Sequence, residues 1–262
     1  MAGFRRPGPL CNTLDGFDLG TLARYQSPIP GFVCSFRIEH IIAEASAEAT
    51  HTAPSKSASN AHPIHNRTRK TAKQKKDFLA AAFDRCQKLG WVEFFKDAAN
   101  GTHFEPALLM GIGYRESHLD PKYLNAAGDH GHGYGLMQID VRSYPKWVHA
   151  GEWKDAKKCI LKGTEVLAAK YKMIESSIGK KIPVRSLRGK KHHFEGKPIN
   201  GEDLLRVSIA AYNCGMWAYY HYSKGHDIDQ GTTGQDYSSD VLLNTQKFKV
   251  LLAQHENRGN KT

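Results

Sequence analysis

Apolar residues recur every three or four positions along several stretches of the chain, as they do in helices that bury one face. This spacing predicts helices over residues 74–89, 91–99, 104–117, 163–178, 203–212 and 240–253. The range 104–117 differs from the others because its apolar residues surround most of the helix. They are Ala107, Leu108, Leu109, Met110 and Ile112. We therefore expect a buried helix that begins near Pro106, a residue suited to a first helical turn.

A glycine-rich stretch follows this helix. Gly128, Gly131, Gly133 and Gly135 make residues 128–135 unsuitable for a helix, and residues 134–140 are expected to form a short strand or one limb of a hairpin. The pattern predicts a mainly α fold of the α+β type, in which a helical domain carries a small antiparallel β-hairpin or sheet at its functional cleft.

The first part of the chain has a different composition. Residues 1–42 have too little patterned apolar surface for a core of their own and are interpreted as an N-terminal extension. Residues 43–76 are poor in apolar residues and end in a basic run, which is typical of a low-complexity linker. Residues 77–258 are then the folded domain.

Charge and length narrow the class of protein. The chain has 262 residues and a formal net charge of +11, so it should be attracted to polyanions. Nothing in the sequence resembles a nucleic-acid-binding module, and nucleic acid is not an expected partner. No stretch is long and apolar enough to span a membrane, so no transmembrane segment is expected.

Three carboxylates lie close together in sequence, around the buried helix and the glycine-rich loop. Glu116 is in the last turn of the predicted helix, whereas Asp129 and Asp140 bracket the loop. Breaking a glycosidic bond requires one protonated carboxyl and one ionised carboxyl, and different surroundings can supply that difference in pKa. Glu116, in a partly dry cleft, suits the acid, and Asp129 and Asp140 suit the ionised role.

Other interpretations of the same residues are weaker. Glu116 alone is more often a surface acid at a helix end. A phosphate cradle would need a strand before the glycines, a helix after them and a Lys-Ser/Thr pair, which are missing from this stretch. Asp129, His130 and His132 offer metal ligands without a second cluster at ligand spacing. We expect neither a metal nor another cofactor.

The motifs as a set resemble goose-type (g-type) lysozymes. The run from Arg115 to Asp140 carries the resemblance, together with residues 211–215 (AYNCG) and 231–237 (GTTGQDY), in a match from about residue 73 to about residue 247. The resemblance implies a lysozyme-like fold and inverting hydrolysis of the β-1,4 bond between N-acetylmuramic acid and N-acetylglucosamine in peptidoglycan. Glu116 would be the general acid, and Asp129 and Asp140 would position and deprotonate the attacking water. Inversion requires acid and base carboxyls about 6.5 to 9.5 Å apart.

The resemblance also implies five substrate-binding residues, namely His118, Gln138, Tyr212, Asn213 and Tyr237. Tyr212 has an equally good interpretation as a core residue with a bonded hydroxyl. Asp236 could equally serve as a turn and cap before a helix that starts at Tyr237. Two positions depart from the family pattern: Cys214 replaces a small residue, and Tyr144 stands where a histidine is common.

A basic insertion separates two predicted helices. Residues 178–200 contain Lys180, Lys181, Arg185, Arg188, Lys190, Lys191, His192, His193 and Lys197. This stretch could grip an anionic wall polymer, but the composition favours a solvated, mobile insertion.

The cysteines and the start of the chain leave the cellular compartment open. The five cysteines are an odd set, so at least one thiol is unpaired within the chain, and Cys11 with Cys34 is the first candidate for a disulfide. The first 30 residues contain no apolar core of about 7 to 15 residues, so no signal peptide is visible. The resemblance nevertheless implies an extracellular protein, which we expect to be a monomer.

Two other functions remain as alternatives. A lytic transglycosylase uses a similar Glu-Ser motif and leaves an anhydro sugar, but the presence of both Asp129 and Asp140 favours hydrolysis by water. A cationic wall-binding antimicrobial without catalysis would keep its activity after Glu116→Gln.

Overall fold

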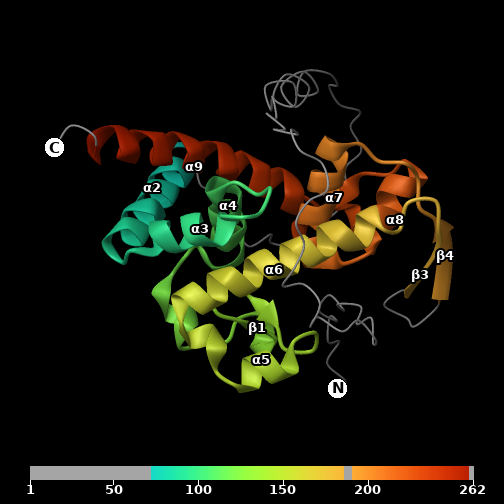
Figure 1. The fold of residues 1–262 in the computed structure, drawn as a ribbon, viewed down its shortest axis with the longest axis horizontal. Helices are drawn as coiled ribbons and strands as arrows, with labels where there is room; N and C mark the ends of the chain where they lie inside the picture. Colours follow the sequence, from blue (N-terminus) through green and yellow to red (C-terminus); the bar gives the residue numbers. More distant parts are fainter. Residues whose placement is uncertain (1–71, 186–190, 260–262) are drawn as a thin grey trace, which may run out of the picture. The chain divides into compact units, whose positions relative to one another are not determined.

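Eight helices and two small antiparallel hairpins make up the part of the chain that the computed structural model describes, residues 72–185 and 191–259 (Figure 1). The helices are α2 (Ala72–Lys88), α3 (Trp91–Ala99), α4 (Pro106–Ser117), α5 (Pro145–His149), α6 (Ala156–Glu175), α7 (Gly201–Cys214), α8 (Trp217–Lys224) and α9 (Tyr237–Gly259). The first hairpin pairs β1 (Gly133–Tyr134) with β2 (Ile139–Asp140), and the second pairs β3 (Lys181–Arg185) with β4 (Lys191–Glu195). The predicted mainly α fold with a small antiparallel sheet is confirmed.

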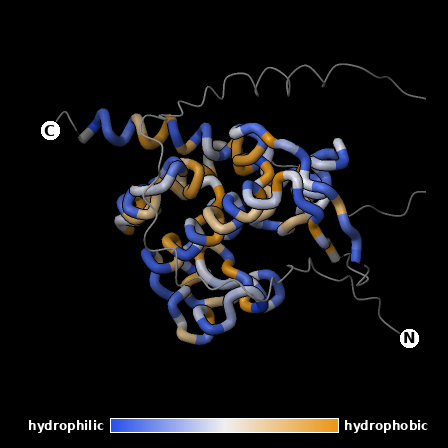
Figure 2. Tube along the Cα trace, turned by 45° about the vertical axis from the view of Figure 1, so that its right-hand side comes forward, coloured by the Kyte–Doolittle hydropathy of each residue, from blue (hydrophilic) through white to orange (hydrophobic). Residues whose placement is uncertain are grey.

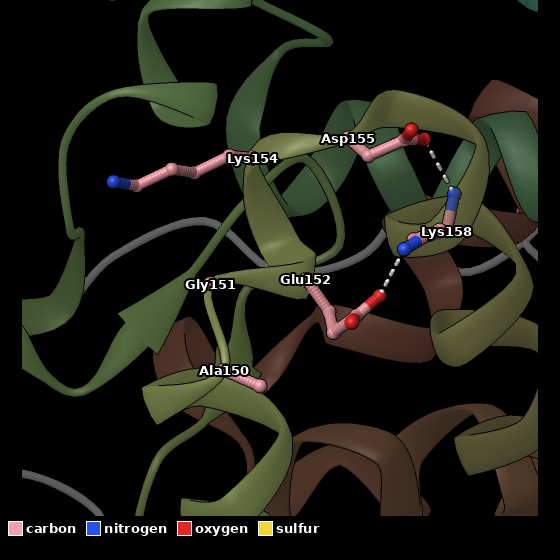
Figure 3. Close-up of a pocket in the computed structure, with 6 residues that line it drawn as sticks. All are labelled: Ala150, Gly151, Glu152, Lys154, Asp155 and Lys158. Carbon is pink, nitrogen blue, oxygen red and sulfur yellow. Dashed lines mark hydrogen bonds and ion pairs between the residues drawn. The ribbon is translucent and has the colours of Figure 1, made fainter.

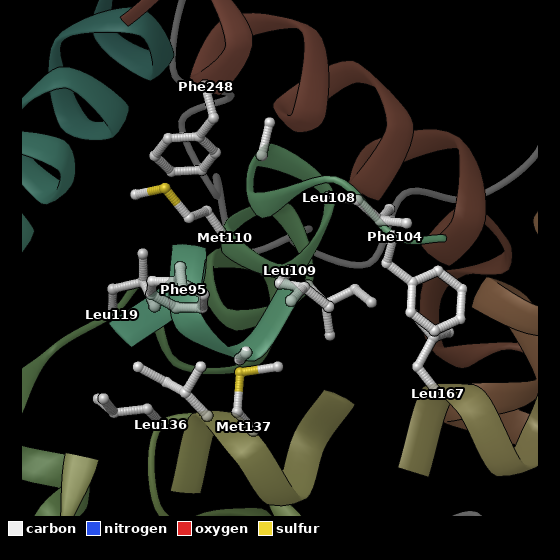
Figure 4. Close-up of a cluster of buried hydrophobic side chains, with 14 of the residues drawn as sticks. Phe95, Phe104, Leu108, Leu109, Met110, Leu119, Leu136, Met137, Leu167 and Phe248 are labelled. Carbon is white, nitrogen blue, oxygen red and sulfur yellow. The ribbon is translucent and has the colours of Figure 1, made fainter. Parts of the chain in front are cut away.

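Helix α4 is the centre of the larger of two hydrophobic clusters. Leu109, Met110 and Ile112 are fully buried, and residues from α3, α6 and α9 surround them (Figure 4). The other helices each bury one face, and their hydrophobic and hydrophilic positions alternate along the trace (Figure 2). A helix buried on most sides cannot shift without disturbing several neighbours, so α4 holds whatever lies at its end in a fixed position.

Helices α4 and α9 approach each other closely at a glycine. A Cβ atom at Gly111 would lie 2.7 Å from the Thr245 hydroxyl oxygen and 3.0 Å from the Val241 carbonyl oxygen. The missing side chain therefore allows the two backbones to come together. This contact brings the start of α9 beside the end of α4.

The second hydrophobic cluster joins α7, α8 and the β3–β4 hairpin. Ile182, Val184 and Phe194 are buried in it, although they lie within the insertion that the sequence analysis interpreted as solvated and mobile. That expectation was wrong for the two strands, because apolar residues on one face of the hairpin pack into the core. Residues 186–190 lie outside the described residues.

Several predicted helix ends moved by a few residues. Helix α6 starts at Ala156 rather than at residue 163, because the Asp155 side chain accepts a hydrogen bond from the Lys158 amide and caps the helix. Gly163 lies inside α6, where a Cβ atom would be 2.6 Å from Cε of Met137. Helix α2 includes residues 72–76 of the predicted linker, and helices α5 and α8 were not predicted.

The described residues include three cysteines. Cys86, Cys159 and Cys214 are buried and form no disulfide with one another, and burial raises the pKa of Cys86 and of Cys159 to about 12. Cys11 and Cys34, the predicted disulfide, lie outside the described residues.

Within the described part of the chain, no helix combines the length and apolar character needed to cross a membrane.

We expect Gly111→Ala to destabilise the domain. The added methyl group has to push α9 away from α4, and overpacking of this kind costs about 1–3 kcal/mol. Thermal unfolding of the variant should give a lower midpoint than that of the parent, and the double variant Gly111→Ala with Thr245→Ala should recover part of the loss. An unchanged midpoint for Gly111→Ala would contradict the tight packing of the two helices.

Candidate active site

The end of α4 is fastened to the first hairpin and to α2 by side chains that bond to backbone. The buried hydroxyl of Ser117 donates to the carbonyl of Leu136 at 2.8 Å and accepts from the Leu119 amide at 3.1 Å. Arg85 donates to the carbonyls of His118 at 2.7 Å and Leu119 at 3.0 Å. These bonds hold the turn that follows Glu116.

Glu116 lies half-buried in the last turn of α4, next to a buried tyrosine. Burial, with a smaller contribution from the nearby charge of Asp129, raises the pKa of Glu116 to about 7. A hydrogen bond from the Tyr237 hydroxyl to Glu116 Oε1, together with the charge of Arg115, opposes this rise. The C-terminal end of a helix also disfavours a negative charge. Glu116 therefore keeps its proton to near neutral pH, as a proton donor requires.

Arg115, the neighbour of Glu116, joins the end of α4 to the start of α9. Its guanidinium pairs with Asp236 at 2.6 Å and with Asp240 at 2.9 Å, and it lies 5.5 Å from the centre of the Tyr237 ring. Asp236 directly precedes α9, and its carboxylate pairs with Arg115. The pairs keep Tyr237 against Glu116.

A buried aspartate organises the first turn of α9. Asp229, which is 1% exposed, accepts hydrogen bonds from the amides of Ser238 at 2.7 Å and Ser239 at 3.2 Å. The hydroxyls of the same two serines also donate to it. Amides at a helix start have no partner within the helix, so this carboxylate satisfies them and fixes the position of Tyr237.

The two loop aspartates have different surroundings. Asp129 is exposed, at φ 43° on a short turn (Asp129–Gly131), and its carboxylate has no hydrogen bond or ion pair among the described residues. Asp140 is half-buried at the end of β2, where Arg142 pairs with one oxygen at 2.8 Å and Ser143 bonds the other through its amide and hydroxyl. Asp129 is therefore available to bind a water molecule, whereas most of the capacity of Asp140 is already used.

The side chains of three predicted substrate-binding residues form hydrogen bonds to backbone groups in the described chain. Gln138 folds over the first hairpin, where its amide donates to the Gly135 carbonyl at 2.8 Å. The Tyr212 hydroxyl donates to the Met137 carbonyl at 2.9 Å. The Asn213 side-chain oxygen accepts from the Thr233 amide at 2.9 Å, which joins α7 to the turn before α9. These contacts agree with the alternative interpretation of Tyr212 as a core residue with a bonded hydroxyl.

The other two predicted binding residues flank the glutamate. His118 is exposed directly after α4, at φ 55°, with its ring edge-on to Tyr114. Tyr237 is buried, and its hydroxyl is bonded to Glu116. The structure thus brings Tyr237 and the charge of Asp129 to Glu116.

A shallow hollow elsewhere on the surface is lined by other residues (Figure 3). Three of its charged residues contact one another, because Lys158 pairs with Glu152 at 2.7 Å and its amide bonds to Asp155 at 3.0 Å. Among the described residues, no group of three or more His, Cys, Asp or Glu is placed to hold a metal ion. We therefore centre the candidate site on Glu116.

Comparison with known sequences identifies the family. The sequence model described as "Lysozyme g" matches residues 55–251, which is more than half of the chain. This chain belongs to the lysozyme g family. Lysozyme g of Struthio camelus and Lysozyme G of Dromaius novaehollandiae are each 36% identical to it over 145 residues. Lysozyme g of Takifugu rubripes is 30% identical over 156 residues, or 58% of this chain and 70% of that protein.

The chain spans only part of the relatives that it matches. The aligned region covers 55% of this chain and 59% of the Struthio camelus protein, with the same shares for the Dromaius novaehollandiae protein. The membership in the lysozyme g family confirms the predicted resemblance to goose-type lysozymes.

Sequence reasoning missed the residues that hold the backbone around this candidate site in place. Arg85 bonds to carbonyls 33 and 34 residues away, and Asp229 bonds to amides nine and ten residues further along the chain, so no pattern within one helix or strand marks these contacts. Ser117 was noticed only as a neighbour of Glu116. The one available signal was the run of serines after Tyr237, which suggests a helix start that needs a partner.

Protonation of Glu116 should couple to stability. Its pKa is about 7 in the folded protein and near 4.5 in an unfolded chain, so the folded state binds more protons between these values. The stability associated with this group is fully present below pH 4.5 and is lost as the pH rises through 7. Glu116→Gln removes this loss, and the variant should be more stable than the parent at pH 8 by on the order of 1–3 kcal/mol.

The test is urea unfolding of the parent and of Glu116→Gln at pH 5 and pH 8. The difference between the two proteins should grow toward pH 8. Equal differences at both pH values would show that the folded environment does not shift the pKa of Glu116.

Proposed function

We propose that this protein is a lysozyme that hydrolyses the β-1,4 bonds between N-acetylmuramic acid and N-acetylglucosamine in peptidoglycan, with inversion at the anomeric carbon. One observation carries the proposal: the site combines Glu116, whose raised pKa favours the protonated form, with Asp129, which is exposed and has no ion pair or hydrogen bond among the described residues. The relatives are named lysozyme g, which agrees with this activity.

Glu116 acts as the general acid. Its raised pKa keeps it protonated near neutral pH, and the proton passes to the leaving glycosidic oxygen as the bond breaks. The Tyr237 hydroxyl bonds only one carboxyl oxygen, Oε1, so the other oxygen can carry the proton toward the substrate. When Glu116 becomes ionised, the same hydroxyl and the Arg115 charge stabilise the carboxylate.

Asp129 takes the main share of the base role. It is exposed and its carboxylate is not bonded within the described residues, so it can orient and deprotonate a water molecule. The oxygens of Asp140 are already bonded to Arg142 and Ser143. Asp140, at the end of β2, therefore contributes to the base role mainly through its charge. His118, Gln138, Tyr212, Asn213 and Tyr237 are proposed to line the sugar-binding cleft.

The rest of the proposal follows the resemblance. Residues 77–258 form the catalytic domain, and the protein acts as a monomer on peptidoglycan outside the cell. Gel filtration of the whole chain and recovery from culture medium test these two points.

Glu116→Gln should abolish turnover. Loss of a general acid typically lowers the rate about 10²- to 10⁴-fold, whereas Asp129→Asn should cost less because Asp140 retains part of the base role. The measurement is the clearing of a suspension of peptidoglycan sacculi, with the released sugars analysed by mass.

Reducing muropeptides from the parent alone support hydrolysis, whereas anhydro ends would assign the protein to the transglycosylases. Activity of Glu116→Gln within about threefold of the parent would contradict the acid assignment, because a lost general acid costs far more.

The pH dependence should report the bond between Tyr237 and Glu116. The parent needs a protonated Glu116, so its kcat/KM should fall as the pH rises through about 7. The Tyr237 hydroxyl lowers the pKa of Glu116, and Tyr237→Phe should therefore move this fall to higher pH while lowering the maximum rate. The matched control is Tyr212→Phe, which removes a hydroxyl that donates to a backbone carbonyl and should leave the fall at the parental pH. A fall at the same pH in all three proteins would contradict the proposed contact.

A further inference from the structure

A second hollow lies where the β3–β4 hairpin meets α8. Its lining residues are Gly179, Lys181, His193, Phe194, Glu195 and Lys224. None of them belongs to the proposed catalytic or sugar-binding set. In Figure 1 the hairpin lies beside α8, at the edge of the helical body.

Two lysines and one glutamate line this hollow, which leaves a net positive charge of one among these three groups. Lys181 and Lys224 are exposed, and neither forms an ion pair with a described residue, Glu195 included. Lys191 on β4 and Lys197 just after it are also exposed without an ion pair among the described residues. Lysines on α6 differ, because Lys157 pairs with Asp97 and Lys162 pairs with Glu165. Unpaired ammonium groups around one hollow create a positive potential that attracts anions.

The hollow is built on a fixed support. The Tyr219 hydroxyl donates to the Lys197 carbonyl at 2.6 Å, and the Tyr222 hydroxyl donates to the Pro198 carbonyl at 3.2 Å. The side of the hairpin that faces the core is buried through Ile182 and Phe194. A ligand at this surface would therefore meet groups whose backbone is already ordered, which lowers the entropic cost of binding.

Aromatic rings of α8 lie next to Lys224, one of the lysines that line the hollow. Trp217 and Tyr220 on α8 are half-buried, with ring centres 4.9 Å apart, and the His192 ring lies 6.0 Å from Trp217. The Lys224 ammonium lies 6.0 Å from the centre of the Tyr220 ring. A partly exposed aromatic face beside ammonium groups offers an apolar surface for a sugar ring and a charge for its acidic substituents.

We propose that this surface, the hairpin site, is a second binding site for an anionic glycan, formed by Lys181, His193 and Lys224 with Trp217 and Tyr220 at its rim. It rests on the proposed function, because it would hold the charged wall polymer while another part of the wall is cleaved. Carboxylates of the wall peptides and phosphodiesters of wall-linked polymers share the chemistry that it recognises.

The test measures binding without turnover, in the Glu116→Gln background. Purified sacculi are sedimented with three proteins. The first is Glu116→Gln, the second also carries Lys181→Gln and Lys224→Gln, and the third instead carries Lys88→Gln and Lys146→Gln. The third protein is the control, because it loses the same charge from exposed lysines on α2 and α5 that form no ion pair with a described residue. Thermal midpoints establish that each protein is folded.

We expect the Lys181/Lys224 variant to bind about fivefold more weakly than the control at low salt, since each exposed charge pair contributes modestly. This difference in binding between the two variants should become smaller in 0.5 M salt, where such charges are screened.

Sacculi stripped of phosphodiester polymers show which anionic groups are bound. If the difference in binding persists on them, the site recognises carboxylates, and if it disappears, the site recognises phosphodiesters.

Equal binding by the two lysine variants would overturn the hairpin site, because net charge alone would then explain attraction to the wall. The absence of binding by Glu116→Gln itself would overturn it as well. Cleavage of sacculi by the parent is scored separately, so failure of the proposed hydrolysis is not confused with failure of the second site.

Discussion

The packing of α9 on α4 is the constraint on which the site depends. Gly111 lets the two helices approach, Asp229 holds the first turn of α9, and Arg115 joins the two helices through Asp236 and Asp240. Together these contacts deliver a buried tyrosine hydroxyl to Glu116. A proton donor must keep its position during the reaction. The packing of α4 in the hydrophobic core holds Glu116, the proposed donor, in a fixed position.

Glu116 and Asp129, the proposed acid and the proposed base, lie in different environments. Glu116 is half-buried at the negative end of a helix, with a carboxylate charge nearby, and each of these factors favours its neutral form. Asp129 lies on an exposed turn where water can solvate its charge. The glycines of the loop allow this turn, and the Gln138 side chain lies over Gly128 and Gly133, where any larger residue would collide with it. One short stretch of chain therefore holds both carboxyl groups to which the proposal gives the acid and base roles of glycosidic cleavage.

Much of this could be predicted from the sequence, and the failures have physical causes. The nearly all-apolar run before Glu116 predicted a buried α4, and the glycine pattern predicted the first hairpin, because both signals are local. Helix α8 was missed because its aromatic residues give no clear apolar stripe, and its packing depends on the second hairpin. The role of Asp229 was missed because it acts on amides nine and ten residues further along the chain. The basic insertion was predicted to be solvated because its many charged residues outnumber the few apolar ones that pack into the core. These are Ile182 and Val184 on β3 and Phe194 on β4.

The most direct test of the account is a titration of the Glu116 carboxyl itself, followed by ¹³C NMR of the glutamate side chains, with Glu116→Gln used to assign the signal. The account predicts one glutamate with a pKa of about 7, whose resonance is absent from the variant. If Glu116 instead titrated near 4.5 with the ordinary glutamates, the account would be contradicted, since the proposed donor would be ionised at neutral pH.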